Sequence, residues 1–71
     1  MNKKKLYEEL MNMTADEIVE RLEQEYKDDE DALQHINTAK LDIKYIKAHK
    51  DYAQTPKQYA MGLVDHLFYW Y

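Results

Sequence analysis

"TADEIVERL", Thr14 to Leu22, contains the clearest helix start in the chain. The Thr14 side chain can accept a hydrogen bond from the backbone N–H of Glu17, and the Glu17 side chain can accept one from the backbone N–H of Thr14. This capping box marks the start of a helix. Apolar residues then recur at helical spacing, at Ile18, Val19, Leu22 and Tyr26. We therefore predict a helix over residues 15–27.

Further helices are predicted on both sides of this stretch. A second capping box, built by Thr55 and Gln58 around Pro56, begins a helix that runs towards the C-terminus. Between the two boxes, a helix of about twenty residues starts after Asp28 or Asp29 and carries a heptad-like apolar seam. The seam consists of Ala32, Ile36, Ala39, Ile43 and Ile46. With a short amphipathic helix near residues 3–11, the sequence predicts an all-α fold, a small bundle of about four helices.

The length of the chain predicts one domain over residues 1–71. A domain of this size buries only about 60% of the surface that its unfolded chain exposes. The chain has no cysteine, which excludes disulfides and thiolate metal sites. Regular helix packing or a second copy of the chain must then supply the stability, and we expect a homodimer.

The sequence also bears on where the protein acts. No stretch approaches the roughly 20 apolar residues of a membrane span, and no apolar run follows the basic cluster Lys3–Lys5, so we expect neither a membrane segment nor a signal peptide. A chain without cysteine suits a reducing compartment. We expect the protein to be cytoplasmic.

The residue inventory argues against catalysis and metal binding. An active site needs several acid–base groups that converge in a cleft, and the lone glycine, Gly62, cannot build a phosphate-binding loop. The acidic run Asp28–Asp31 lacks the central glycine and final glutamate of a calcium loop. Asp31 and His35 lie one helical turn apart, but two ligands do not make a metal site. We expect no enzyme activity, no cofactor and no metal.

Negative charge is concentrated in the first half of the chain. Residues 8–31 carry eleven Asp or Glu against Arg21 and Lys27, although the net charge of the whole chain is only −4. Such a run is either a solvated surface or a line of carboxylates that imitates the phosphates of DNA and docks on a basic protein. The residues of the candidate acidic surface are Asp16, Glu20, Glu23, Asp28, Asp29, Glu30 and Asp31.

Positive charge gathers on the third predicted helix, at Lys40, Lys44 and Lys47. A DNA-binding regulator would need such a basic helix, but the acidic helix before it repels phosphates, so we do not expect direct binding of nucleic acid. The lysines are expected to pair with the acidic helix instead, within the molecule or across a dimer.

The C-terminal helix carries more apolar residues than one face can hold. We assign Leu63, Val64 and Leu67 to the core. The surplus aromatic residues are candidates to hold a dimer or to anchor a partner, because such residues dominate binding energy at interfaces. This candidate anchor consists of Phe68, Tyr69, Trp70 and Tyr71.

"VDHLF", residues 64–68, resembles the hydrophobic half of the short motif by which bacterial proteins bind the replication sliding clamp. Leu67 and Phe68 match its final pair, whereas Val64 stands where that motif has Gln. In its general character the whole chain resembles small phage-encoded proteins that inhibit host replication or transcription proteins. This resemblance implies a dimeric inhibitor with a protein partner in the host cytoplasm.

The leading hypothesis is therefore a small acidic protein-binding module. It would inhibit a basic, DNA-binding host protein, such as a sliding clamp, by imitating DNA. Two alternatives remain, a DNA-binding regulator that uses the lysines of the third helix and a structural subunit of a larger assembly.

Overall fold

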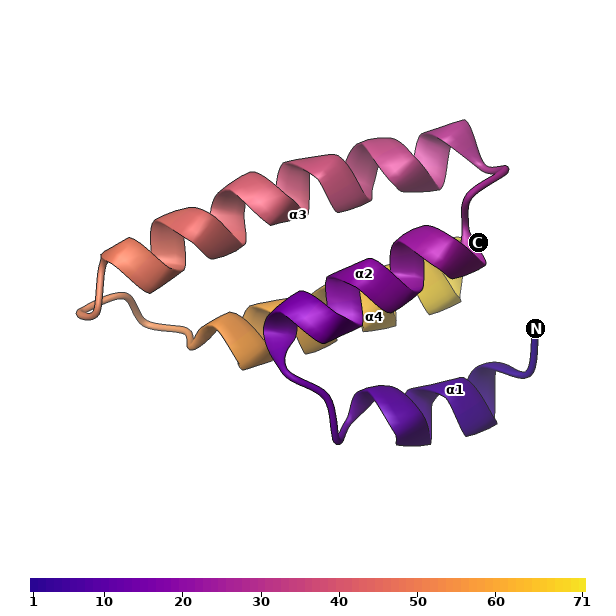
Figure 1. Ribbon diagram of the computed structural model, residues 1–71, viewed down its shortest axis with the longest axis horizontal. Coiled ribbons are helices and arrows are strands. Elements are labelled where there is room, and N and C mark those ends of the chain that lie inside the picture. The colour runs from indigo at the N-terminus through magenta and orange to yellow at the C-terminus, as the bar shows by residue number, and fades with distance from the viewer.

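Four helices form in this chain and no strand is present, as the sequence predicts. The computed structural model describes residues 1–71 (Figure 1). The helices are α1 (Lys3–Leu10), α2 (Ala15–Glu25), α3 (Glu30–Ala48) and α4 (Pro56–Trp70). The prediction of an all-α bundle is thus confirmed for the single chain.

Side-chain caps set the helix starts. The Thr14 hydroxyl accepts from the backbone N–H of Glu17 at 3.2 Å, and the Thr14 N–H donates to Glu17 Oε1 at 2.9 Å. Thr55 and Gln58 form the same pair of hydrogen bonds at α4. The Asp29 side chain caps α3 by accepting from Ala32 N. Both predicted capping boxes are confirmed.

Helix α2 ends two residues before its predicted end. Tyr26 has a φ of −110° and a ψ of 23°, which lies outside the helical region, so the chain turns there towards α3. The turn lets the Tyr26 ring enter the core, where it is 5% exposed. The apolar pattern alone could not mark this end, because a buried Tyr26 fits the pattern of a longer helix equally well.

Helix α4 is the centre of the bundle, because it packs against each of the other three helices. In Figure 1, α3 runs along one side of the molecule, α2 lies over α4, and α1 crosses the opposite side. The turn between α2 and α3, the C-terminus and the N-terminus lie at the same end of the molecule (Figure 1). The connection between α3 and α4 lies at the other end.

The core gathers one apolar face from every helix. All five seam residues of α3 are buried, and so are the three residues of α4 that were assigned to the core. The largest side chains that are fully buried are Leu10, Ile18, Leu22, Ile36, Val64 and Leu67. Burial of these side chains is the main favourable term in the stability of the fold.

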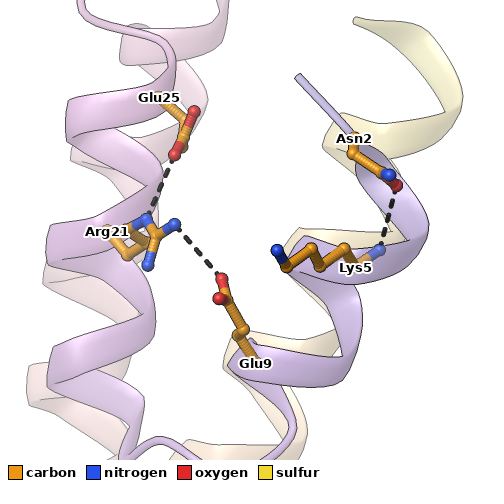
Figure 2. Close-up of polar contacts among 5 residues, drawn as sticks. All are labelled: Asn2, Lys5, Glu9, Arg21 and Glu25. Atoms are coloured by element: carbon orange, nitrogen blue, oxygen red, sulfur yellow. Dashed lines mark hydrogen bonds and ion pairs between the residues drawn. The ribbon is translucent and has the colours of Figure 1, made fainter.

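Polar contacts hold α1 and its following turn against the bundle. Arg21 on α2 donates to Glu9 on α1 at 3.2 Å and to Glu25 at 3.1 Å (Figure 2). The Lys57 ammonium donates to the carbonyl of Met11 at 2.7 Å and to that of Met13. Exposed ion pairs contribute only about 0–1 kcal/mol each, so these contacts orient α1 more than they stabilise it.

None of the four helices is long and apolar enough to cross a membrane.

Candidate functional site

The turn between α2 and α3 and the first turn of α3 together carry four consecutive carboxylates, which we call the acidic turn: Asp28, Asp29, Glu30 and Asp31. Three of these residues are exposed and Asp29 is half-buried. None of the four forms an ion pair with a lysine or arginine. The positive end of the α3 dipole offsets part of this charge, which explains why the sequence tolerates it locally. The acidic turn still offers a concentrated negative charge to the solvent.

The acidic residues of α2 have a different environment. Lys47 Nζ pairs with Asp16, and Lys40 Nζ lies 2.6 Å from Glu23 Oε2. The expected pairing of the basic stripe with the acidic helix is therefore confirmed for these two lysines, within one chain. Glu20 makes no ion pair, and neither does Lys44. Lysines thus neutralise two carboxylates of α2, and Arg21 pairs with a third, Glu25, so the unpaired charge is concentrated at the acidic turn.

The Glu17 carboxylate is also on α2, but its role is local. The backbone N–H of Thr14 donates to it, and this hydrogen bond lowers the pKa of the carboxyl group below its usual value. The Glu17 carboxylate thus serves the cap of α2, as the Asp29 carboxylate serves the cap of α3.

The four C-terminal aromatic residues divide into two pairs. Phe68 is half-buried against Tyr7, with ring centroids 6.4 Å apart, and Tyr71 packs edge-on against Tyr26 at the same distance. Tyr69 and Trp70, in contrast, are 78% and 66% exposed. The fold therefore uses the first pair to close its own core and leaves the second pair free for contact with another molecule.

The exposed aromatic residues and the acidic turn lie at the same end of the bundle. The Tyr26 hydroxyl contacts the carbonyl of Leu67 at 3.4 Å, which brings the end of α2 against the end of α4. Lys3 donates to the carbonyl of Phe68 at 2.8 Å, so the first turn of α1 meets the same end. Figure 1 shows the C-terminus beside the turn that leads into α3.

The structure also contains a groove between α3 and α4, which the sequence does not predict. It has a volume of about 400 Å³ and is open to solvent. Its lining residues are His35, Thr38, Gln54, Tyr59, Gly62, Leu63 and His66. The sequence hint of this groove is Gly62, a glycine in the middle of a predicted helix.

The groove offers hydrogen-bonding groups but no fixed charge. The rings of His35 and His66 meet edge to face at 4.8 Å between centroids, one from each helix. Thr38 adds a hydroxyl and Gln54 an amide. Nowhere in the molecule do three or more His, Cys, Asp or Glu side chains group in a way that could hold a metal ion. The chemistry of the groove suits a neutral, partly apolar group that can donate or accept a hydrogen bond.

Tyr59 at the edge of the groove gives a pH-dependent prediction. Its burial and the hydrogen bond that it donates to Asp42 raise the pKa of the phenol to about 12, from an ordinary value of about 10. Because the pKa is raised in the folded state, the neutral phenol stabilises the fold below about pH 10, and this contribution is lost as the pH rises to about 12. Urea unfolding measures the free energy of unfolding at about pH 9 and at about pH 11.5. The decrease between these two pH values should be larger for the wild type than for Tyr59→Phe. Equal losses for the two proteins would contradict this assignment.

A second, smaller hollow of about 220 Å³ lies between α1 and α2, around Arg21. Figure 2 shows the guanidinium between Glu9 and Glu25, with the amino end of Lys5 directed towards the same space. The hydrogen bond with Glu25 raises the pKa of Arg21, so the guanidinium stays protonated. The two positive and two negative side chains there cancel in net charge. We interpret the cluster as a set of contacts that hold α1 against α2.

The segment that resembles a clamp-binding motif lies within α4, and Leu67 is fully buried. Leu67 is therefore not exposed to a partner in this fold. No protein-family model, no curated protein and no solved structure matches the chain. The resemblance to small phage-encoded inhibitors accordingly has no relative to support it, and the functional proposal must come from the residues themselves.

Proposed function

We propose that this protein is a small acidic protein-binding module that docks on a basic, nucleic-acid-binding protein and inhibits it. The observation that carries the proposal is the acidic turn, where four adjacent carboxylates have no basic partner within the chain. At two positions on α2, by contrast, carboxylates are already paired with lysines. The unpaired charge at one exposed end is the part of the surface best suited to an external cation.

The partner class follows from this charge. DNA carries one negative charge per roughly 1.7 Å of its axis, and residues of a helix rise by about 1.5 Å each. Glu30 and Asp31, in the first turn of α3, therefore approach the linear charge density of DNA, and the adjacent Asp28 and Asp29 add two more carboxylates. A protein channel that binds DNA, such as that of a sliding clamp, would attract it by the same electrostatic steering. The module would then inhibit by occupying the channel.

The fold favours this proposal over a DNA-binding regulator. Two of the three lysines that such a regulator would use, Lys40 and Lys47, are paired with carboxylates of α2. Phosphates would have to compete with these carboxylates for the lysines. Direct binding of duplex DNA therefore has less support in the geometry than binding of a basic protein.

A charge-reversal variant tests the proposal. The double variant Asp28→Lys, Asp31→Lys should weaken binding to the captured partner by about tenfold or more, because like charges then oppose each other. Asp29 is left unchanged because its side chain caps α3. The matched control, Glu8→Lys with Asp51→Lys, makes the same change in net charge at exposed positions outside the candidate surface. It should bind the partner as well as the wild type does, apart from a small general effect of net charge.

The measurement is a pull-down from host lysate, followed by competition on the purified partner. The captured protein should be basic, should be released at about 0.5 M salt, and should be displaced by duplex DNA. Failure to capture a protein, or capture that the double variant retains undiminished, would refute the proposal. A partner that duplex DNA does not displace would refute the imitation of DNA.

A further inference from the structure

The exposed face of α4 has an unusual composition for this chain. Of all the residues in the protein, 34% are charged, and exposed helix faces normally carry most of this charge. The exposed positions of α4 are Gln58, Gly62, Asp65, His66, Tyr69 and Trp70, with a single carboxylate among them. Depletion of charge together with enrichment in Tyr and Trp is typical of a buried interface.

Gly62 has no role within its own chain that explains it. It lies in the middle of α4, it has no positive φ, and a Cβ atom built on it would have no neighbour within 4 Å. Alanine at this position would favour the helix by about 1 kcal/mol. Neither the backbone nor the packing of the single chain therefore requires a glycine. The absence of a side chain instead keeps the groove between α3 and α4 open.

Trp70 supplies a group of the kind that the groove accepts. Its indole lies beside His66, with ring centroids 6.5 Å apart, and His66 also lines the groove. Trp70 does not occupy the groove of its own chain, because it is 66% exposed at the end of α4. An indole is mostly apolar with one N–H donor. Thr38 and Gln54 offer acceptor oxygens on the groove wall.

We propose that a second copy of the chain covers this face, with the two α4 helices antiparallel about a twofold axis at His66. Gly62 lies four residues before His66 and Trp70 lies four residues after it. An antiparallel pair centred on His66 therefore sets Trp70 of each copy opposite Gly62 of the other. The largest side chain of the face, Trp70, thus meets the position without a side chain, Gly62, on each side of the axis. Each indole enters the groove of the other copy.

Helix geometry and charge both suit this arrangement. Residues four apart form the ridges that interdigitate in the commonest class of helix packing. Asp65, the one carboxylate on the face, lies next to the axis, one residue from the point where the His66 residues of the two copies meet. The acidic turn lies at the C-terminal end of α4, so an antiparallel pair keeps the two acidic turns at opposite ends of the dimer. A parallel pair would bring them together.

The size of the face indicates the strength of the dimer. Helix α4 has 15 residues and is about 22 Å long, so the contact falls below the roughly 800 Å² per partner of a standard interface. We expect a dissociation constant in the micromolar range. The inference goes beyond the proposed function and does not rest on it, because dimerisation is measured without any partner.

Cross-linking tests the twofold axis directly, because the chain contains no cysteine. Packed helix axes lie about 8–10 Å apart and each Cα lies about 2.3 Å from its axis, so the Cα atoms of residue 66 in the two copies are expected about 3–5 Å apart. This range overlaps that of disulfides. His66→Cys should therefore form a covalent dimer under mild oxidation. The control Tyr45→Cys, on the outer face of α3, should cross-link much more slowly.

Analytical ultracentrifugation tests the contact between Trp70 of one copy and Gly62 of the other. A concentration range of about 1–300 µM spans the expected dissociation constant. Trp70→Ala should raise the dissociation constant by about 30-fold or more, as loss of an interface hot spot does. Gly62→Gln should raise it similarly, while its thermal stability at low concentration stays equal or rises, because Gln favours a helix more than Gly does. Tyr45→Ala removes another exposed aromatic ring, on α3, and should leave the dimer unchanged.

Three outcomes would overturn the proposal. The first is a wild-type mass equal to one chain over the whole range of concentration. The second is a dimer whose dissociation constant in Trp70→Ala and in Gly62→Gln equals that of the wild type. The third is Tyr45→Cys cross-linking as fast as His66→Cys. None of these outcomes bears on the pull-down of a basic protein, so the two proposals fail separately.

Discussion

Leu22→Ala is expected to destabilise the protein by about 2–5 kcal/mol. Leu22 is 0% exposed in the middle of α2, where its side chain belongs to the core shared by all four helices. Removal of its outer carbons loses transfer free energy and leaves a cavity that rigid neighbours fill only in part. A domain of this size has a total stability of roughly 4–10 kcal/mol, at 0.05–0.15 kcal/mol per residue. The variant should therefore be partly or wholly unfolded at 37 °C.

Leu41→Ala is the matched control. It makes the same chemical change in the middle of α3, but Leu41 is 71% exposed. Its effect should be within about 0.5 kcal/mol of zero. Urea unfolding followed by circular dichroism measures both variants. Similar midpoints for the two would show that the described core is not the one that holds the fold together.

Ala39→Leu should produce the second large effect, from the opposite cause. Ala39 is 1% exposed in the seam of α3, which packs against α2 and α4, so a larger side chain has no space there. Overpacking of a filled core typically costs about 1–3 kcal/mol through forced rotamers and backbone shifts. The matched control is Ala48→Leu, at the exposed end of the same helix, which should change the stability little.

Ala39→Leu and Ala48→Leu are compared by thermal unfolding at equal protein concentration. The melting temperature should fall by several degrees for Ala39→Leu, since about 1 kcal/mol shifts a domain of this size by roughly 4–8 °C. A melting temperature for Ala39→Leu equal to that of Ala48→Leu would contradict the close approach of α3 to its neighbours.

Much of the fold could be predicted because its signals are local. The hydrogen bonds of Thr14 and Thr55 join residues three apart, so the residue types at that spacing suffice to place the starts of α2 and α4. The seam of α3 was equally readable, since burial of one face requires apolar residues at helical spacing. Helix ends without a cap signal, such as the end of α2 at Glu25, were less well predicted.

The candidate site was predictable only in part. Asp28 and Asp31 stand out in any charge count, and the excess of aromatic residues after Leu67 is visible in the sequence. Which of those aromatic residues are available was not visible. Phe68 and Tyr71 are half-buried because Tyr7 and Tyr26 reach them from α1 and from the end of α2, far away along the chain.

Local sequence thus suffices to predict the four helices, the apolar face of each and the place where negative charge is concentrated, because these properties depend on neighbours within about one helical turn. Helix packing, in contrast, sets which charges are neutralised, which aromatic rings remain exposed and where a groove opens. Lys47 meets Asp16 across 31 positions of the chain, and the groove at Gly62 exists only because α3 and α4 lie side by side. Such outcomes depend on how helices distant in sequence pack together, which no local spacing records.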